Sequence, residues 1–368
     1  MSETVLEIHL PKLRHNYQFL RKRLASTTKL LAVVKAFGYG SDAVAVAKCL
    51  AACGADYFGV AYVQEGMALR NAGITQPILV MHPQQQNLEA LIKHKLEPAI
   101  YNHRIFDAFL ATLKATETTH YPIHLKFNTG LNRLGFQPNQ TNQLLDLLDQ
   151  NKNLLQLKGV YSHLAASDDL DEEAFTQAQL EQFDTIVQAI KPIFPDTIFH
   201  VLNTSGVLNH AAAQYDMVRT GISLYGYGND SAVDAQLKPV LTLKTVISQL
   251  HSLQKGDSLG YSRAFVAKEK TRTATLPLGH ADGIGRIYGN GNGYVWIHGQ
   301  KAPIIGNVCM DMIMVDVTNI ACSEGDEVIV IGENESAEAL ANHAGTISYE
   351  FITGLSQRIP RKTISELL

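Results

Sequence analysis

Short apolar runs alternate with longer amphipathic stretches between residue 29 and residue 221. Runs of this length, rich in β-branched residues, predict strands that are buried on both faces. The eight runs are residues 29–34, 56–61, 77–81, 97–101, 122–127, 158–163, 197–202 and 216–219. The amphipathic stretches between them predict helices, among them residues 43–53, 64–72, 140–148 and 172–190.

Strands that alternate with helices are joined by right-handed crossovers and pair in parallel. Eight such units within residues 29–221 favour a closed (β/α)8 barrel, which takes roughly 200–250 residues. An open doubly wound sheet is the alternative, but no G-x-G-x-x-G motif follows the first run, which weighs against a dinucleotide-binding domain. A helix over residues 13–21, with Pro11 in its first turn, leads into the first strand. We therefore expect an α/β fold with a barrel over residues 1–235.

The pattern changes near residue 238, where β-rich runs separated by turn signals replace the strand–helix alternation. The runs are residues 240–250, 271–276, 293–298, 302–305, 312–317 and 327–332. They predict a mostly antiparallel β-domain over residues 236–368, with helices over 336–344 and 347–355. The polar segment 228–237 is the expected linker.

Composition narrows the class of protein. The 368 residues are 46% apolar and 18% charged, which is enough to bury two cores. The net charge is −4 and no Lys/Arg tract is present, so we expect no nucleic-acid partner. No apolar stretch reaches the ~20 residues that span a bilayer. The acidic start without a long apolar run predicts no signal peptide, and four cysteines without disulfide spacing predict a cytoplasmic protein.

Lys35 directly follows the first predicted strand and precedes a turn that contains Gly38 and Gly40. Burial disfavours the charged form of an amine, and a neutral amine is a nucleophile that can form a Schiff base. The two glycines allow a tight turn and a close approach of the backbone to a ligand. On these residues alone, a reactive lysine and a structural lysine at the barrel rim are equally good interpretations.

Polar side chains recur at the C-terminal ends of five predicted strands, where the active sites of such barrels lie. They are Lys35, Lys126, Arg133, His163, Asn203, Thr204, Ser205 and Arg219. One such residue would mean little, because strand ends are often polar, but their coincidence predicts an active site.

The last two strand ends also predict a phosphate site. Gly221 and Ile222 offer backbone N–H groups after the eighth strand, as do residues 203–205 at a helix start. Barrels often bind phosphate at these positions. A phosphate site and a reactive lysine on the same rim suggest pyridoxal phosphate (PLP) as the cofactor.

Four motifs, in this order, resemble those of the PLP-dependent alanine racemase family, and the resemblance spans essentially the whole chain. They are residues 32–40, 128–135, 277–283 and 306–311. The resemblance implies an enzyme that interconverts L-alanine and D-alanine by two-base proton transfer and supplies D-alanine for peptidoglycan. It also implies a homodimer in which the β-domain completes the partner subunit's active site.

The resemblance assigns roles position by position. Lys35 would hold PLP as a Schiff base and act as one base, and Tyr261 would be the base on the opposite face. The cofactor contacts, besides Lys35, would be Tyr39, Arg133, His163, Asn203, Thr204, Arg219, Gly221, Ile222 and Tyr349.

Residues near the substrate are also implied by the resemblance. Arg133, Met310 and Asp311 would bind the small amino-acid substrate. Lys126 matches a lysine that is carbamylated in some members and orients the arginine that Arg133 matches. A plain lysine, solvated or paired with a carboxylate, is the other interpretation of Lys126.

The chain departs from the family pattern at four positions near these motifs. Phe37 stands where an asparagine is common, Ser41 where a histidine often follows, His280 where a tyrosine is usual, and Asn307 where some members have an arginine. These changes affect the access path and the substrate detail, but they remove no proposed catalytic group.

Other functions share parts of this plan. A PLP-dependent decarboxylase would have the same two domains, but it would place a carboxylate at the pyridine nitrogen, where Arg219 is expected. A noncatalytic PLP-binding barrel would lack the β-domain and Tyr261. A racemase of broader specificity that includes serine stays open, as does an origin from a fusion with a cell-wall ligase. No metal site is expected.

Overall fold

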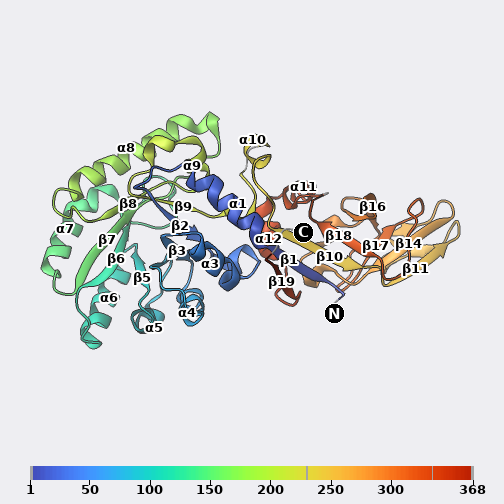
Figure 1. Cartoon of the computed structure of the whole chain (residues 1–368), viewed down its shortest axis with the longest axis horizontal. Coiled ribbons are helices and arrows are strands. Elements are labelled where there is room, and N and C mark those ends of the chain that lie inside the picture. Colours follow the sequence, from blue (N-terminus) through green and yellow to red (C-terminus); the bar gives the residue numbers. More distant parts are fainter. Residues whose placement is uncertain (1–2, 229–230, 334, 366–368) are drawn as a thin grey trace. The chain divides into compact units, whose positions relative to one another are not determined.

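The structure, a computed structural model, describes residues 3–228, 231–333 and 335–365 (Figure 1). The chain divides into two compact units. The barrel unit comprises Arg14–Gly38 and Ala43–Leu237, and the β-unit comprises Met1–Leu13, Tyr39–Asp42 and Lys238–Leu368. Two segments that were expected in the first domain, residues 1–13 and 39–42, thus group with the C-terminal unit.

The barrel unit is built on eight parallel strands in the order β8-β7-β6-β5-β4-β3-β2-β9. Backbone hydrogen bonds from Asp216 N to Phe199 O (3.1 Å) and from Arg219 N to Leu202 O (3.0 Å) join the two ends of this order. The strands are β2 (Lys29–Val33), β3 (Tyr57–Val60), β4 (Ile78–Val80), β5 (Glu97–Ile100), β6 (Tyr121–Lys126), β7 (Leu155–Tyr161), β8 (Ile198–His200) and β9 (Met217–Thr220). Each coincides with a predicted run, which confirms the expected barrel.

Helices cover the outside of these strands (Figure 1). The sequence of α6 shows why: Asn102 Oδ1 caps the helix by accepting a hydrogen bond from Ile105 N (2.9 Å), and the buried Ile105, Phe106, Phe109 and Leu113 lie on one face. The helices are α3 (Ala43–Ala52), α4 (Val63–Asn71), α5 (Leu88–Lys93), α6 (His103–Ala115), α7 (Thr141–Gln150), α8 (Glu173–Ile190) and α9 (Thr204–Asn209). Helix α1 (Leu10–Arg21) precedes β2, as predicted.

The β-unit contains a nine-stranded sheet in the order β11-β14-β17-β16-β15-β18-β10-β1-β19. Neighbours are antiparallel except β1 and β19, so the predicted antiparallel-rich domain is confirmed. The strands are β1 (Val5–His9), β10 (Leu241–Val246), β11 (Gln249–Leu253), β14 (Thr271–Leu276), β15 (Tyr294–Ile297), β16 (Gln300–Ile305), β17 (Ile313–Asp316), β18 (Glu327–Ile331) and β19 (Arg361–Ile364).

Strand β1 was not predicted from the sequence. It pairs with β10 on one side and with β19 on the other, and this pairing places the start of the chain in the β-unit. Two predicted helices are present as α11 (Ala337–His343) and α12 (Ser348–Gly354). Residues 229–230 of the expected linker lie outside the described residues, and helix α10 (Ser231–Asp234) follows them. No helix in the described part of the chain is long and apolar enough to cross a membrane.

Candidate active site

Lys35 begins a turn with an uncommon backbone. The five residues after it, Ala36 to Gly40, all have positive φ angles, between 52° and 78°. A left-handed conformation costs a residue with a side chain roughly 1–2 kcal/mol. Such strain persists only where the surrounding structure imposes it, and it clusters at functional sites. At Gly40 a side chain is also excluded by space, because a Cβ atom would lie 1.9 Å from Ile352 O within the β-unit.

The Lys35 amine is partly buried in the barrel unit. Burial, and then the positive charge of Arg133, lower its pKa from the ordinary value, whereas Glu65 raises it. A larger fraction of the amine is therefore neutral than in water, and the neutral form is the nucleophile.

Lys126, the last residue of β6, is buried. Burial and the neighbouring Arg133, Arg219 and Lys35 lower its pKa to about 8. Among the described residues no carboxylate forms an ion pair with Lys126. The interpretation of Lys126 as a lysine paired with a carboxylate therefore finds no partner in the described chain.

Arg133 lies on the loop that follows β6. The loop folds back on the strand through hydrogen bonds from Phe136 N to Lys126 O (2.9 Å) and from Asn128 N to Phe136 O (2.8 Å). Gly135 permits this return, since a Cβ atom there would lie 2.5 Å from the Phe127 carbonyl carbon. Asn128 Oδ1 also accepts hydrogen bonds from two backbone N–H groups within the loop. The backbone that carries the exposed Arg133 is therefore fixed before any ligand binds.

Arg219 lies on β9 and is almost fully buried. Its Nη1 donates to His200 Nδ1 (2.8 Å) and His200 O (3.1 Å). Its Nη2 donates to Ser162 O (2.7 Å), His163 Nδ1 (3.1 Å) and Val201 O (3.1 Å). Only its Nε–H makes no hydrogen bond with a described residue, so this donor is available to a ligand. Burial lowers the pKa of Arg219 to about 10, and the guanidinium stays charged near neutral pH.

The two histidines that contact Arg219 are therefore neutral acceptors at Nδ1, because a guanidinium can only donate. Burial, and then the charge of Arg219, hold the pKa values of His163 and His200 well below the usual range. His200 stacks on Tyr161 with ring centroids 4.9 Å apart. His163 was predicted from the sequence and His200 was not, although a histidine inside a predicted buried strand was a visible signal.

The residues of the barrel unit that were predicted to bind phosphate lie at the starts of two short helical segments. Asn203 Oδ1 caps α9 by accepting from Gly206 N (2.9 Å), and Thr204 Oγ1 accepts from Gly221 N (2.9 Å). Ile222 begins the 3-10 turn η5 (Ile222–Tyr225) and is fully buried. Its N–H donates to no described group, which is uncommon for a buried backbone amide. This free N–H fits a phosphate, as the free Nε–H of Arg219 fits a pyridine nitrogen, so the barrel unit fits PLP.

Tyr39 and Tyr349, the other predicted phosphate contacts, both belong to the β-unit. Their ring centroids lie 6.0 Å apart, and burial together with Tyr349 raises the pKa of Tyr39. Tyr39 is thus held as a neutral phenol that can donate its proton in a hydrogen bond.

Tyr261 begins η6 (Tyr261–Arg263), between the short strands β12 (Ser258–Leu259) and β13 (Phe265–Val266) of the β-unit. This loop is strained like the turn after Lys35, with φ angles of 73° at Gly260, 59° at Ser262 and 50° at Arg263. The side chain of Tyr261 is 72% exposed. Asn307 Nδ2 donates to Tyr261 O (3.1 Å), so the Asn307 side chain holds the Tyr261 backbone.

Met310 and Asp311 lie on a second loop of the β-unit, which pairs with residues 279–283. His280 N donates to Cys309 O and Ala281 N donates to Met310 O, each with a donor–acceptor distance of 3.0 Å. Arg358 clamps both loops: its Nε lies 2.6 Å from Asp282 Oδ1, and its Nη2 lies 2.6 Å from Asp311 Oδ1. The sequence analysis missed Arg358, because nothing local marks an arginine whose partners lie 47 and 76 residues earlier.

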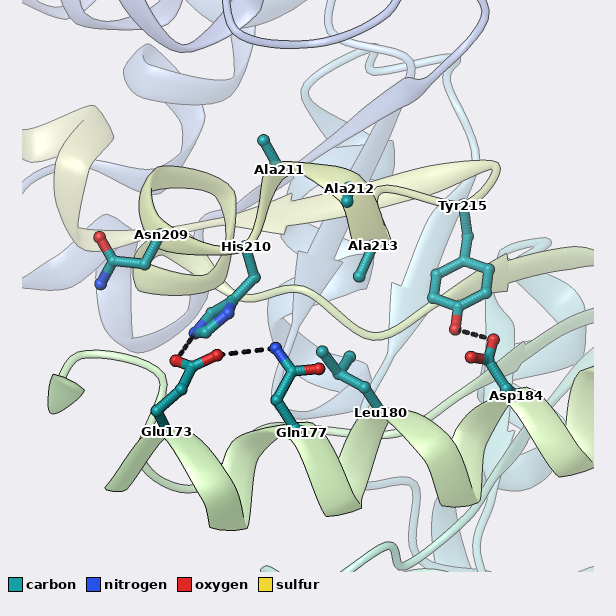
Figure 2. A pocket seen from close by; sticks show the side chains of 10 residues that line it. All are labelled: Glu173, Gln177, Leu180, Asp184, Asn209, His210, Ala211, Ala212, Ala213 and Tyr215. Carbon is teal, nitrogen blue, oxygen red and sulfur yellow. Dashed lines mark hydrogen bonds and ion pairs between the residues drawn. The ribbon is translucent and has the colours of Figure 1, made fainter. Parts of the chain in front are cut away.

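A pocket of about 440 Å³ lies elsewhere in the barrel unit, between α8 and residues 209–215 (Figure 2). Its polar groups bind one another: Glu173 pairs with His210 and Gln177, and Tyr215 donates to Asp184. None of the predicted site residues lines it.

The structure brings together Lys35, Lys126, Arg133, His163 and Arg219 in the barrel unit, as their mutual electrostatic effects show. Tyr39, Tyr261, Met310, Asp311 and Tyr349 belong to the β-unit. A barrel with a nucleophilic lysine after its first strand, a free arginine N–H and a free backbone N–H defines a PLP-binding barrel enzyme.

Comparison with known proteins is more specific. The family models for the N-terminal and C-terminal domains of alanine racemase match residues 8–229 and 240–363. The chain belongs to the alanine racemase family, whose members are PLP-dependent isomerases.

Relatives match over the whole length. The alanine racemases of Thermodesulfovibrio yellowstonii and Citrifermentans bemidjiense are 36% and 37% identical, each over 98% of this chain and over 97% and 98% of the relative. The solved alanine racemase of Clostridium difficile 630 covers 100% of this chain and 97% of its own, with a TM-score of 0.94 and 31% identity. The enzyme from Bacillus anthracis with bound L-Ala-P covers 100% and 96%, with a TM-score of 0.92 and 28% identity.

Proposed function

We propose that this chain interconverts L-alanine and D-alanine, with PLP held covalently by Lys35, and so supplies D-alanine for peptidoglycan. The observation that carries the proposal is the hydrogen bonding of Arg219, which leaves only its Nε–H to face a ligand. An arginine at the pyridine nitrogen donates a hydrogen bond but gives up no proton. Arg219 would thereby leave a pyridine nitrogen unprotonated, and this would favour return of the proton to the α-carbon over other outcomes.

When bound, PLP delocalises the negative charge that remains on the α-carbon of the substrate after proton removal. Inversion of that carbon needs one group that takes the proton and another that returns it on the opposite face. We assign these roles to Lys35 and Tyr261, each worth typically 10²–10⁴-fold in rate. The neutral Lys35 amine is suited to accept a proton, because burial and Arg133 lower its pKa.

Tyr261 needs a different environment to act as a base. A tyrosine normally titrates near ~10, and nearby positive charges lower that value. The barrel unit supplies such charges in Arg133 and Arg219. A site that combines the barrel cations of one subunit with Tyr261 of a second subunit would therefore allow Tyr261 to act as the base.

A homodimer with shared sites would satisfy this need. Tyr261, Met310 and Met312 are 72%, 59% and 49% exposed, although they are large and largely apolar. Exposed apolar groups that gather on neighbouring loops mark a surface that binds a partner. We infer that Tyr261, Met310 and Asp311 are supplied by the partner subunit, and that Met310 and Asp311 lie near the substrate together with Arg133 of the barrel.

Within the barrel unit, Asn203, Thr204, Gly221 and Ile222 would hold the phosphate of the cofactor. The free N–H of the buried Ile222 and the cap at Asn203 support this assignment. In the β-unit, Tyr39 and Tyr349 carry phenol groups that are suited to bind a phosphate. His163 would pack near the cofactor ring, because it hydrogen-bonds to Arg219.

Lys126 is proposed to carry a carbamate. Its amine is buried and its pKa is lowered to about 8, so a substantial neutral fraction is available to react with carbon dioxide. The carbamate would then bring a negative charge to a region with three neighbouring cations, Arg133, Arg219 and Lys35. It would hold the exposed Arg133 in place.

We also expect the enzyme to act in the cytoplasm, since all four cysteines are free.

Product analysis tests the proposal. The purified protein, with PLP present or absent, is incubated with single enantiomers of alanine, serine and other small amino acids. We expect PLP-dependent formation of the opposite enantiomer, with alanine the best substrate. Release of carbon dioxide without racemisation would instead identify a decarboxylase. Comparable rates with serine would identify the broader racemase.

A further inference from the structure

Glu65, in the first turn of α4, contacts two separate parts of the barrel unit. Its Oε2 accepts hydrogen bonds from Ala61 N (2.7 Å) and Tyr62 N (3.0 Å). Its Oε1 accepts a hydrogen bond from Ala36 N (2.6 Å), the amide directly after Lys35. One half-buried carboxylate therefore binds the start of its own helix and the turn that carries the nucleophile.

Helix capping explains only one of these oxygens. The bonds to Ala61 and Tyr62 satisfy amides ahead of the first turn of α4, as a capping glutamate at this position does. The bond to Ala36 contributes nothing to α4, because it reaches a residue 29 positions earlier in the sequence. It is also the shortest of the three. A charge-assisted bond of this length is stronger than one between neutral groups.

The turn after Lys35 needs such an anchor. Ala36 has a φ of 52° and starts the left-handed segment that runs to Gly40. On the other side of Lys35, Val34 N donates to Gly59 O (2.9 Å). The backbone on both sides of Lys35 is thus tied to a neighbouring element of the barrel: Val34 is bound to the end of β3, and the peptide group after Lys35 is bound to Glu65. Together they fix the Cα position of Lys35.

Glu65 also acts on the charge of Lys35. Of the groups that shift the pKa of the Lys35 amine, burial and Arg133 lower it and Glu65 alone raises it. The carboxylate therefore opposes the cations of the barrel and keeps part of the amine protonated.

We propose that Glu65 is a positioning residue for Lys35: through the Ala36 amide it sets where the Lys35 amine stands on its face of the substrate. This inference rests on the proposed function, in which Lys35 exchanges a proton with the α-carbon. Glu65 itself touches neither substrate nor cofactor in this account.

The test compares Glu65→Gln and Glu65→Asp with the unaltered holoenzyme. In Glu65→Gln the amide oxygen caps α4 and the NH2 group faces the Ala36 N–H, so the bond to Ala36 is lost. In Glu65→Asp the charge remains, but the shorter side chain does not reach Ala36. Glu89→Gln is the matched control, because Glu89 lies in the first turn of α5 and is exposed.

Hydrogen exchange gives a readout that is independent of activity. We expect the Ala36 amide to exchange about ten-fold faster or more in both Glu65 variants, and not in the control. The pH dependence of PLP association with the cofactor-free protein separates charge from position. Its midpoint should move to lower pH in Glu65→Gln, since the amine loses its one acidic neighbour, and stay in place in Glu65→Asp.

Isotope effects with Cα-deuterated alanine link the position to the chemistry. Each enantiomer loses its proton to a different base, so a misplaced Lys35 should raise the isotope effect for one enantiomer only. Asn307→Ala, which frees the Tyr261 backbone, should raise it for the other enantiomer. Isotope effects that are equal for the two enantiomers in Glu65→Gln, or an unchanged hydrogen-exchange rate of the Ala36 amide, would overturn the role of Glu65. Absence of racemisation in the unaltered protein would instead overturn the proposed function, while the exchange result would stand.

Discussion

The turn after Lys35 and the loop of Tyr261 share a strained, left-handed backbone but differ in how they are held. Lys35 follows a buried parallel strand, and hydrogen bonds from Val34 N to Gly59 O and from Ala36 N to Glu65 hold the backbone on both sides of it. Tyr261 lies on an exposed loop between two two-residue strands, and the main support of its backbone is Asn307. In the proposed mechanism Lys35 is therefore held in place within its own unit, whereas Tyr261 would have to be covered by another surface before it could act as a base.

Their electrostatic surroundings differ in the same sense. Lys35 belongs to a group of cations that includes Arg133, Lys126 and Arg219. The loops near Tyr261 carry acidic side chains, and Arg358 is bound to two of them, Asp282 and Asp311. The barrel thus holds buried cations of the kind that would lower the pKa of a tyrosine, whereas Arg358 in the β-unit is already paired with two carboxylates. This difference supports the proposal that two chains share each site.

The largest effect is expected at the buried base. Lys35→Ala removes both the covalent link to PLP and one proton-transfer group, so racemisation should fall by at least ~10³-fold. The absorbance of the covalently bound cofactor should disappear as well. Lys29→Ala, at the opposite end of the same strand, serves as the control. An unchanged absorbance of the covalently bound cofactor in Lys35→Ala would contradict the assignment of Lys35 as the residue that binds PLP.

The exposed base should give a different signature. Tyr261→Phe deletes only the hydroxyl, so racemisation should fall by about 10²–10⁴-fold while the cofactor absorbance persists. Steady-state rates and absorbance spectra on the same samples check this. Loss of the bound cofactor in this variant would contradict the division of labour between the two regions.

The charge on the buried Lys126 amine should make the free energy of unfolding depend on pH. Its folded pKa of about 8 lies below the ordinary 10.5, so between these values the unfolded chain binds more protons than the folded one. Stability therefore rises with pH across this window, and the cost of the charged amine is fully present below pH 8.

Lys126→Met should remove that cost. In cofactor-free protein and carbon dioxide-free buffer, its free energy of unfolding should exceed that of the unaltered protein by about 2–3 kcal/mol at pH 7. The difference should vanish as the pH approaches 10.5. Denaturant unfolding across this range measures it. Lys152→Met, on an exposed surface pair, should show no such dependence.

The smallest effect concerns strain. Phe37 is 62% exposed with a φ of 57°, so Phe37→Gly should raise the unfolding free energy by about 0.5–1 kcal/mol. Phe175→Gly, at an exposed position inside α8, should lower it by about 1 kcal/mol. Thermal unfolding of both variants compares them. Destabilisation by Phe37→Gly would mean that the phenyl ring makes contacts that outweigh the strain.

The sequence predicted the barrel strands because each is a short apolar run between helices, a local and periodic signal. Strand β1 escaped because five residues that pair with β10 and β19 carry no local mark of their distant partners. The left-handed turn escaped because Ala36, Phe37 and Tyr39 are residues that ordinarily avoid positive φ.

The candidate site divides in the same way. Residues at strand ends, such as Lys35 and Arg219, could be predicted from position and from the resemblance. Glu65 and Arg358 could not, because their contribution is a set of hydrogen bonds to residues far away in the sequence. Side chains that position others leave little trace in a single sequence.

Subunit mixing tests the central claim most directly. Lys35→Ala and Tyr261→Phe are each inactive in this account, but a heterodimer contains one site with the unaltered Lys35 and the unaltered Tyr261. The two variants are unfolded, refolded together, and heterodimers are identified by mass. The account predicts that racemisation returns in proportion to the heterodimer. Heterodimers that form without any activity would contradict a site built from the barrel of one chain and Tyr261 of the other.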